Sequence, residues 1–211
     1  MVSASDHRNR QLRSSRFNGK YVLYWMIRDK RVHDNWALLE AQKIAIEQKV
    51  PLLVCFQFIG SYKKANIRQY QFLFEGLKDT EKELHKYQIG FILLKGAAEV
   101  QIPKIIDQHV VGHLVTDFSP LKVYRNRLKK VLSKVSIPVT QVDAHNIVPV
   151  WHASDKKEFA AYTIRPKIKK FLPTFLSEIP KVKKHPFYFK NIITKTDWSF
   201  INSLEIDYSV I

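Results

Sequence analysis

Five short apolar runs, each about the length of one strand, recur along the first two thirds of the chain. Continuous runs of this kind are typical of strands that are buried on both faces of a sheet, since a half-exposed strand would alternate apolar and polar positions. The predicted strands are Tyr21–Ile27, Leu52–Phe58, Phe91–Leu94, His113–Thr116 and Pro138–Val142.

Stretches with a helical repeat of apolar positions separate these runs. The first is predicted over roughly Asn35–Lys49, where Asp34 or Asn35 can cap the helix by accepting a bond from a free backbone N–H. Strands that alternate with helices through short connections favour right-handed crossovers and parallel neighbours. The pattern therefore predicts an α/β fold: a five-stranded, mostly parallel, doubly wound sheet of the Rossmann or flavodoxin-like kind, with helices on both faces. The apolar stripes of the other three helices are Tyr70, Leu73, Phe74, Leu77 and Leu84; Ile102, Ile105, Ile106 and His109; and Tyr124, Leu128, Val131, Leu132 and Val135.

The alternation stops after the fifth run. Asp143–Ser154 is neither helix-periodic nor strand-alternating, and one more helix is predicted over roughly Ile168–Glu178. From Lys181 onward the chain lacks the periodic apolar surface that a core of its own would need. We expect a basic, disordered arm over residues 1–18, an α/β domain over 19–180, and a linker over 181–211.

Composition adds a strong positive charge to this picture. Thirty-five Lys and Arg residues against 19 Asp and Glu give a formal net charge of +16. Such a chain is attracted to polyanions, nucleic acid first, although much of the charge can equally be a solvated face. The single cysteine, Cys55, excludes an internal disulfide and fits a reducing compartment, the cytoplasm first, with nucleus or organelle left open.

Polar side chains gather where predicted strands end. No Gly-rich phosphate loop, Walker loop or nucleophile elbow is found, and no histidine stands at a helical i, i+4 pairing with Glu. If the first and fourth strands are neighbours, their following loops flank the crevice where doubly wound sheets usually hold ligands. The alternative is that these charges only satisfy one another at the sheet edge. The residues are Arg28 and Asp29 after the first strand; Asp117, Phe118 and Ser119 after the fourth; and Asp143, His145 and Asn146 after the fifth.

The motif RDKRVHDNWALL, which follows the first strand, resembles the opening motif of the photolyase and cryptochrome superfamily. Further segments resemble the class II cyclobutane-dimer photolyases in order and spacing, of which DAHNIVPVW is the most specific. The resemblance runs roughly from Tyr21 to Ile211. Tyr162 and Lys122 depart from it, since both stand where the family pattern leads us to expect arginine. The other matching segments are PLLVCFQF, RQYQFLFEGL, VTDFSPLKV, QVDAHNIVPVW and SDKKEFAAYTIRPKI.

This resemblance implies a particular organisation and role. Photolyases join an N-terminal α/β domain, which can hold an antenna chromophore, to a helical domain that binds FAD and splits pyrimidine dimers in DNA by light-driven electron transfer. The chain resembles the α/β domain and the interdomain linker, so we expect no repair by these residues alone. The implied cofactor is a deazaflavin or folate antenna, with FAD only in the helical domain. The residues expected to line its crevice are Arg28, Asp29, Asn35, Asp117, Phe118, Ser119 and Asn146.

The expected partners are an FAD-binding helical domain, in cis or as a separate chain, and DNA in the context of a full enzyme; no membrane is expected. Trp151, Phe159 and the segment Phe187–Phe189 are candidates for the docking face. An alternative remains, in which the domain is a non-catalytic remnant or a basic module for a partner or nucleic acid, binding DNA in a salt-dependent and sequence-blind way. The DNA-contact candidates are Arg165, Lys167, Lys169 and Lys170.

Overall fold

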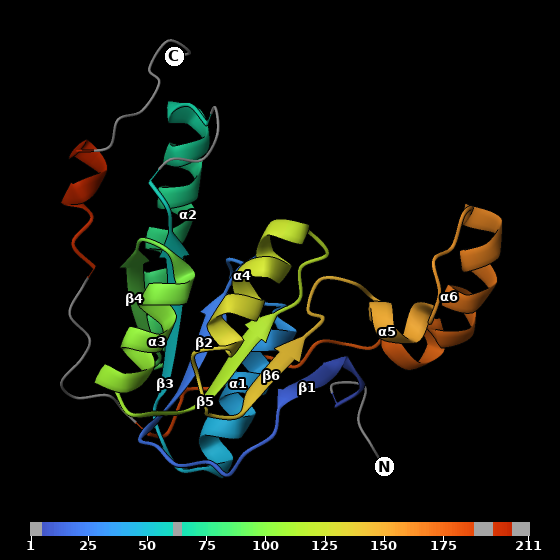
Figure 1. Cartoon of the computed structure of the whole chain (residues 1–211), viewed down its shortest axis with the longest axis horizontal. Helices are drawn as coiled ribbons and strands as arrows, with labels where there is room; N and C mark the ends of the chain where they lie inside the picture. The colour runs from blue at the N-terminus through green and yellow to red at the C-terminus, as the bar shows by residue number, and fades with distance from the viewer. Residues whose placement is uncertain (1–5, 61–64, 188–195, 204–211) are drawn as a thin grey trace.

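The computed structural model of the protein describes residues 6–60, 65–187 and 196–203, and in it six strands form one sheet flanked by helices (Figure 1). The strands are β1 (Asn9–Arg13), β2 (Tyr21–Met26), β3 (Leu52–Phe58), β4 (Gly90–Lys95), β5 (Val111–Asp117) and β6 (Val139–Val142). The helices are α1 (Trp36–Glu47), α2 (Ile67–Lys86), α3 (Ala98–Gln108), α4 (Lys122–Leu132), α5 (Val150–Ala153) and α6 (Ala161–Phe175), with short 3-10 turns at Asp6–Arg8 and Ser199–Ser203.

The strand order is β1-β6-β5-β2-β3-β4, and every pair except β1 with β6 is parallel. From β2 the chain winds outward through β3 to β4, then returns to β5 on the other side of β2. This is the doubly wound topology that the apolar runs predict, and the fold class is confirmed. The first and fourth predicted strands, β2 and β5, are neighbours, with Tyr24 opposite Val115.

Strand β1, which the sequence pattern did not predict, corrects the prediction of a disordered arm over residues 1–18. Residues 9–13 instead form β1, which pairs antiparallel with β6, with Asn9 opposite Val142 and Arg10 opposite Gln141. An edge strand buries little side-chain surface, and charged residues on it discourage pairing with other chains. The sequence NRQLR contains only one apolar residue, so the hydrophobic pattern does not predict a strand here.

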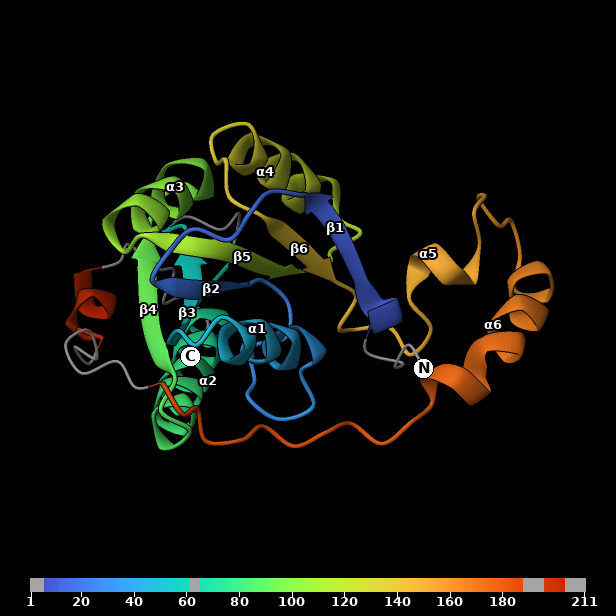
Figure 2. The same cartoon turned by 90° about the horizontal axis from the view of Figure 1, so that it is seen from below.

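Two apolar layers, one on each face of the sheet, explain the continuous runs of the central strands. On one face, alternate residues such as Val22 and Val54 pack with α1 and α2. On the other, Leu23 and Leu53 pack with α3 and α4. Figure 2 shows these two helix pairs on opposite sides of the sheet. Both faces of β2 and β3 are thus removed from water, which is the main stabilising contribution of the fold.

The C-terminal third departs from the prediction in its boundaries. α6 begins at Ala161, seven residues before the predicted start, and it contains Pro166 and Pro173. Proline removes a helical hydrogen bond and usually marks a boundary, which is why the sequence pattern placed the helix too late. α5 and α6 form a hairpin with a small core of its own, centred on Phe175. The hairpin lies at the end of the sheet beside β1 and β6 (Figures 1 and 2).

The described parts of the predicted linker are packed on the domain. The Gln42 side chain bonds both the carbonyl oxygen of Lys183, at 2.7 Å, and its backbone N–H, at 3.2 Å. Farther along, the buried Glu81 carboxylate accepts bonds from the Thr196 backbone and hydroxyl and from the Trp198 indole. Residues 188–195 and 204–211 of this segment, Phe189 of the expected docking face included, lie outside the described residues. Within the described ranges, no helix has the length and apolar character to cross a bilayer.

Candidate functional site

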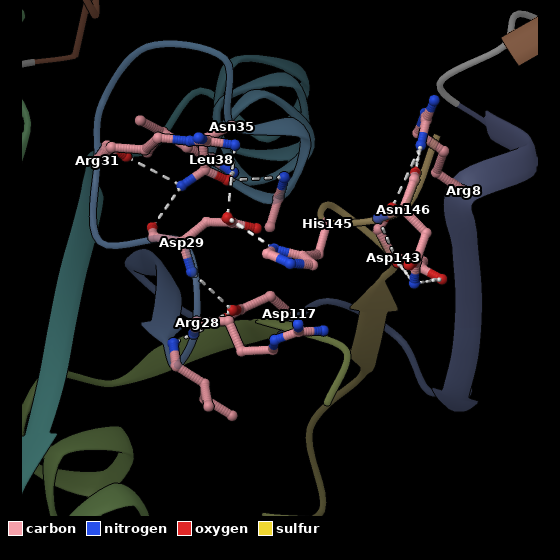
Figure 3. Close-up of polar contacts among 12 residues, drawn as sticks. Arg8, Arg28, Asp29, Arg31, Asn35, Leu38, Asp117, Asp143, His145 and Asn146 are labelled. Atoms are coloured by element: carbon pink, nitrogen blue, oxygen red, sulfur yellow. Dashed lines mark hydrogen bonds and ion pairs between the residues drawn. The ribbon is translucent and has the colours of Figure 1, made fainter. Parts of the chain in front are cut away.

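The carboxylate of Asp117, at the end of β5, occupies the crevice between β2 and β5. It is 1% exposed, and it accepts bonds from the backbone N–H groups of Ile27 at 2.8 Å, Arg28 at 2.5 Å and Asp29 at 3.3 Å (Figure 3). Burial raises the pKa of Asp117, and the N–H donors from the β2 loop oppose that rise. Asp117 therefore ties the loop after β2 to the end of β5.

Asn35 fixes the other end of the same loop. Its side-chain oxygen accepts two bonds from backbone N–H groups in the first turn of α1, which confirms the predicted cap. Its side-chain nitrogen donates to the Tyr24 hydroxyl and to the carbonyl oxygens of Asp29 and Arg31, at 3.0–3.2 Å. Both polar atoms of this fully buried side chain are thus used within the protein.

Asp29 lies between these two anchors and is 5% exposed. One carboxylate oxygen is 3.4 Å from the Arg31 guanidinium and 3.4 Å from the His145 imidazole, both partly exposed (Figure 3). The other carboxylate oxygen is buried and has no hydrogen-bond partner among the described residues. The structure thus joins the loops after β2 and β6 through Asp29 and His145, a contact that the sequence did not predict.

Asp143 and Asn146 form a separate cluster after β6. The Asp143 carboxylate accepts bonds from the Asn146 backbone and side chain at 3.0–3.2 Å, and from the Val150 backbone N–H at 2.9 Å. Arg8 reaches this loop from the N-terminal segment and donates to the carbonyl oxygens of Asn146 at 2.7 Å and Ile147 at 2.8 Å. Asn146 therefore shapes its own loop, and the structure does not bring its side chain to Asp117.

The space left at the predicted crevice is small. Beside Ile27, Asp117 and Ser119 a cavity of only about 10 Å³ remains, room for about one water molecule. Ser119 is buried and its hydroxyl accepts from the Leu121 backbone N–H, while the Phe118 ring meets Trp151 edge-on at 5.9 Å. That the seven predicted residues bind a ligand stays a prediction, and the groups at this crevice mostly have protein partners.

A larger cavity, of about 200 Å³, opens one strand away, at the carboxyl ends of β2 and β3. None of the seven predicted cofactor-binding residues is in its lining. It lies between α2 on one face of the sheet and α4 on the other. The lining residues are Trp25, Met26, Ile27, Lys30, Phe56, Gln57, Phe58, Ile59, Tyr70, Leu73, Tyr124 and Arg127.

The lining combines aromatic walls with two cationic groups. The Lys30 ammonium lies 5.5 Å from the centre of the Phe56 ring, and burial lowers the pKa of Lys30. The Arg127 guanidinium lies 5.3 Å from the centre of the Tyr124 ring. Such a lining suits a planar aromatic molecule that carries hydrogen-bond acceptors or negative charge. No group of metal-ligating side chains occurs within the part of the chain that the structure describes.

The sequence pattern missed this lining because most of it looks like core. Tyr70, Leu73 and Tyr124 sit on apolar helical stripes, and Trp25 lies within a buried strand. One signal was available: Gln57 is the one polar residue in β3, a strand that is buried along its whole length. Gln57 lines the cavity, and its side chain donates to the carbonyl oxygen of Gly96.

The DNA-contact candidates lie on α6. Arg165, Lys169 and Lys170 are exposed, which leaves them accessible to a phosphate. Lys167 is different, because its ammonium is 2.6 Å from the Glu158 carboxylate and 3.0 Å from the Ser154 hydroxyl. Their contact with DNA stays a prediction.

Comparison with known proteins places the chain in a family. Residues 22–185 match the DNA photolyase family. Proteins named deoxyribodipyrimidine photo-lyase are 44% identical over 191 residues in Potorous tridactylus, 40% over 181 residues in Arabidopsis thaliana, and 35% over 176 residues in Methanothermobacter thermautotrophicus. The alignments cover 89%, 84% and 83% of this chain and 36%, 36% and 39% of the relatives. The chain belongs to the DNA photolyase family.

A solved structure supports the fold alone. A cryptochrome from a Synechocystis species superposes with a TM-score of 0.61 at 15% identity, covering 81% of this chain and 37% of that one. The chain thus spans a little over a third of the length of the curated relatives that it matches. The part that matches the family, residues 22–185, contains strands β3 to β6, all of β2 except Tyr21, and the residues that line the cavity.

Proposed function

We propose that this chain is the α/β part of a class II cyclobutane-dimer photolyase, and that its own role is to hold a light-absorbing chromophore in the cavity at the ends of β2 and β3. Family membership supports the first half of this proposal. The second half rests on one observation, an aromatic cavity with a half-buried lysine and an arginine at the carboxyl edge of a doubly wound sheet. A bound chromophore would supply light absorption.

The protein's residues would bind and orient that chromophore. Phe56, Phe58 and Tyr70 supply aromatic walls on the α2 side, and Tyr124 supplies one on the α4 side. Lys30 and Arg127 offer donors to carbonyl or ionised oxygens of the ring system, strengthened by the low local dielectric. A deazaflavin ring fits this description, and a folate pterin is the other candidate.

Repair itself is proposed only for a longer assembly. In the partition that we propose, residues 19–180 together with strand β1 form the antenna-type domain, and residues 181–211, which pack partly on it, lead to an FAD-binding helical domain, in cis or as a separate chain. Phe159 is 87% exposed and Tyr162 is 78% exposed on the α5–α6 hairpin, which also carries the half-buried Trp151. Large apolar side chains that are exposed together on one element are typical of a docking surface. The hairpin is therefore the proposed contact for that partner.

The test is chromophore binding by a cavity-filling variant. Purified chain is dialysed against a deazaflavin or a methenyl folate, and the bound fraction is read from near-UV and blue absorbance. Leu73 lines the cavity, and Leu73→Trp inserts a large ring there, so we expect binding to fall by about tenfold or more, about 1.4 kcal/mol.

The matched control is Phe72→Trp, one position along α2, where the side chain is 83% exposed. It should bind as tightly as the unaltered chain. If Leu73→Trp bound the chromophore as tightly as Phe72→Trp, the cavity would not be the binding site. If neither chromophore binds the unaltered chain, the antenna role itself fails.

A further inference from the structure

α4 carries a different charge from the helices on the other face of the sheet. It contains five Lys or Arg residues among eleven and no Asp or Glu. α2, with twenty residues, contains four of each sign, and two of its lysines, Lys82 and Lys86, pair with carboxylates three residues earlier. The positive charge of α4 is thus not balanced within its own helix.

Three of these cations form one outward row. Lys122, Arg125 and Lys129 follow one another at intervals of three and four residues, which places them on the same side of a helix. All three are exposed, and across the described ranges no ion pair joins them to a carboxylate. The other cations point elsewhere: Lys130 pairs with Glu99 at 3.0 Å, and Arg127 lines the cavity.

β1 extends the row at the edge of the sheet. Arg10 lies opposite Gln141, and directly paired residues of antiparallel strands share a face. Gln141 lines the 10 Å³ cavity together with Arg125, so Arg10 lies on the face that α4 covers. Arg13 donates to the carbonyl oxygen of Leu132 at 2.8 Å, which holds β1 against the end of α4. Figure 2 shows β1 and α4 at this end of the sheet.

We propose that Arg10, Lys122, Arg125 and Lys129 form a surface that binds the phosphate backbone of duplex nucleic acid, whatever its sequence. From Lys122 to Lys129 the helix rises about 10 Å. A duplex carries about six phosphate charges over that length. Asn126 and Ser133, which are exposed beside the row, are polar, and the exposed apolar side chains Leu121 and Val123 are confined to the start of α4. A membrane-binding face would instead place apolar side chains all along its cations.

This surface is distinct from the cavity and from α6, and it needs neither a chromophore nor a lesion. Contacts of this kind give affinity without sequence information, because they touch only the backbone. The proposal therefore adds an activity that does not depend on the proposed antenna role. It also differs from the DNA-contact prediction made from the sequence, which places those contacts on α6.

Three matched triple variants separate these possibilities. Each changes one Arg and two Lys to Gln: Arg125, Lys122 and Lys129 on α4; Arg165, Lys169 and Lys170 on α6; and Arg68, Lys82 and Lys86 on α2 as the control. Binding of a labelled, unirradiated duplex is followed by fluorescence anisotropy over a range of salt concentrations. Thermal melts followed by circular dichroism confirm that each variant is folded.

The α4 triple is expected to weaken binding by about tenfold or more near physiological salt and to reduce the slope of log K against log salt by about 2–3, near 0.9 per lost phosphate contact. The α2 triple should change both quantities far less. An equal loss of duplex affinity in the α2 triple would show that binding depends only on net charge, which would overturn the proposal. A loss confined to the α6 triple would overturn it in favour of α6. Tighter α4-dependent binding to phosphatidylserine vesicles than to the duplex would overturn it in favour of a membrane surface.

Discussion

Two buried aspartates stand at the ends of adjacent parallel strands, and they use their carboxylates differently. Asp117 ends β5 and bonds the backbone of residues 27–29, which belong to the loop of a neighbouring strand. Asp143 follows β6 and bonds Asn146 and Val150 within its own loop. Both are at most 1% exposed.

The difference shows how the neighbouring backbone decides what a strand-end carboxylate does. Because Asp117 bonds across β2 and β5, it fills the crevice at the point where the chain reverses direction, and the open cavity lies instead beside β3. Because Asp143 bonds locally, it shapes a loop from which the α5–α6 hairpin begins. An aspartate at a strand end thus fills the crevice in one case and orders the loop that leads into α5 in the other.

Asp117→Asn tests the first half of this comparison and should have the largest effect. An amide offers one acceptor atom where the carboxylate offers two, and its NH₂ group faces N–H donors. We expect a loss of about 4 kcal/mol in the free energy of unfolding, measured with urea. Hydrogen exchange should accelerate at the amides of residues 27–29. The matched Asp143→Asn should instead accelerate hydrogen exchange at the amides of residues 146 and 150. Faster exchange at residues 27–29 in both variants would contradict the distinction.

Arg8→Met tests the second half. Arg8 is 2% exposed, its guanidinium lies 4.7 Å from the centre of the Trp36 ring, and it donates to the carbonyl oxygens of Asn146, Ile147 and Phe175. Losing these bonds should cost about 3 kcal/mol. Limited proteolysis should cut residues 146–175 earlier than the sheet. Arg10→Met, two residues along the chain on the exposed edge strand β1, is the control, and equal cleavage in both variants would show that Arg8 does not hold the hairpin.

His113 links the two strands that carry these aspartates, since its imidazole is 2.9 Å from the Thr140 hydroxyl on β6. Burial lowers the pKa of His113 to about 4. Its folded pKa is below the unfolded value, so the stability it contributes is present above about pH 6.5 and is lost as the pH falls toward 4. Between pH 7 and 5 the unaltered chain should lose about 2 kcal/mol more stability than His113→Gln. Parallel pH curves for the two proteins would contradict this.

The sheet and its topology could be predicted from the sequence because strands buried on both faces leave continuous apolar runs. The site could be predicted only in part. Asn35, one of the two cap candidates, caps α1, and β2 and β5 are neighbours, which was the condition for the predicted crevice. That Asp117 would close the crevice depends on backbone geometry that no sequence pattern carries.

Other features were hidden for specific physical reasons. Arg8 lies in a segment with Arg10, Arg13 and Arg16, and nothing in their order distinguishes the one that becomes buried. β1 is polar because it is an edge strand. The sequence does not distinguish the cavity lining from core, because aromatic side chains such as Tyr124 are as typical of a helix stripe as of a pocket wall.

The central claim is that a chromophore binds in the cavity between α2 and α4, and methyl NMR tests it most directly. The chain contains two methionines, Met1 and Met26, and Met26 lines the cavity. With isotope-labelled methionine methyl groups, titration with the deazaflavin should shift the Met26 signal saturably and leave Met1 unchanged, and Leu73→Trp should abolish the shift. Chromophore binding that leaves Met26 unmoved while shifting the backbone amides of Arg28 and Asp29 would contradict the claim and return the site to the crevice between β2 and β5.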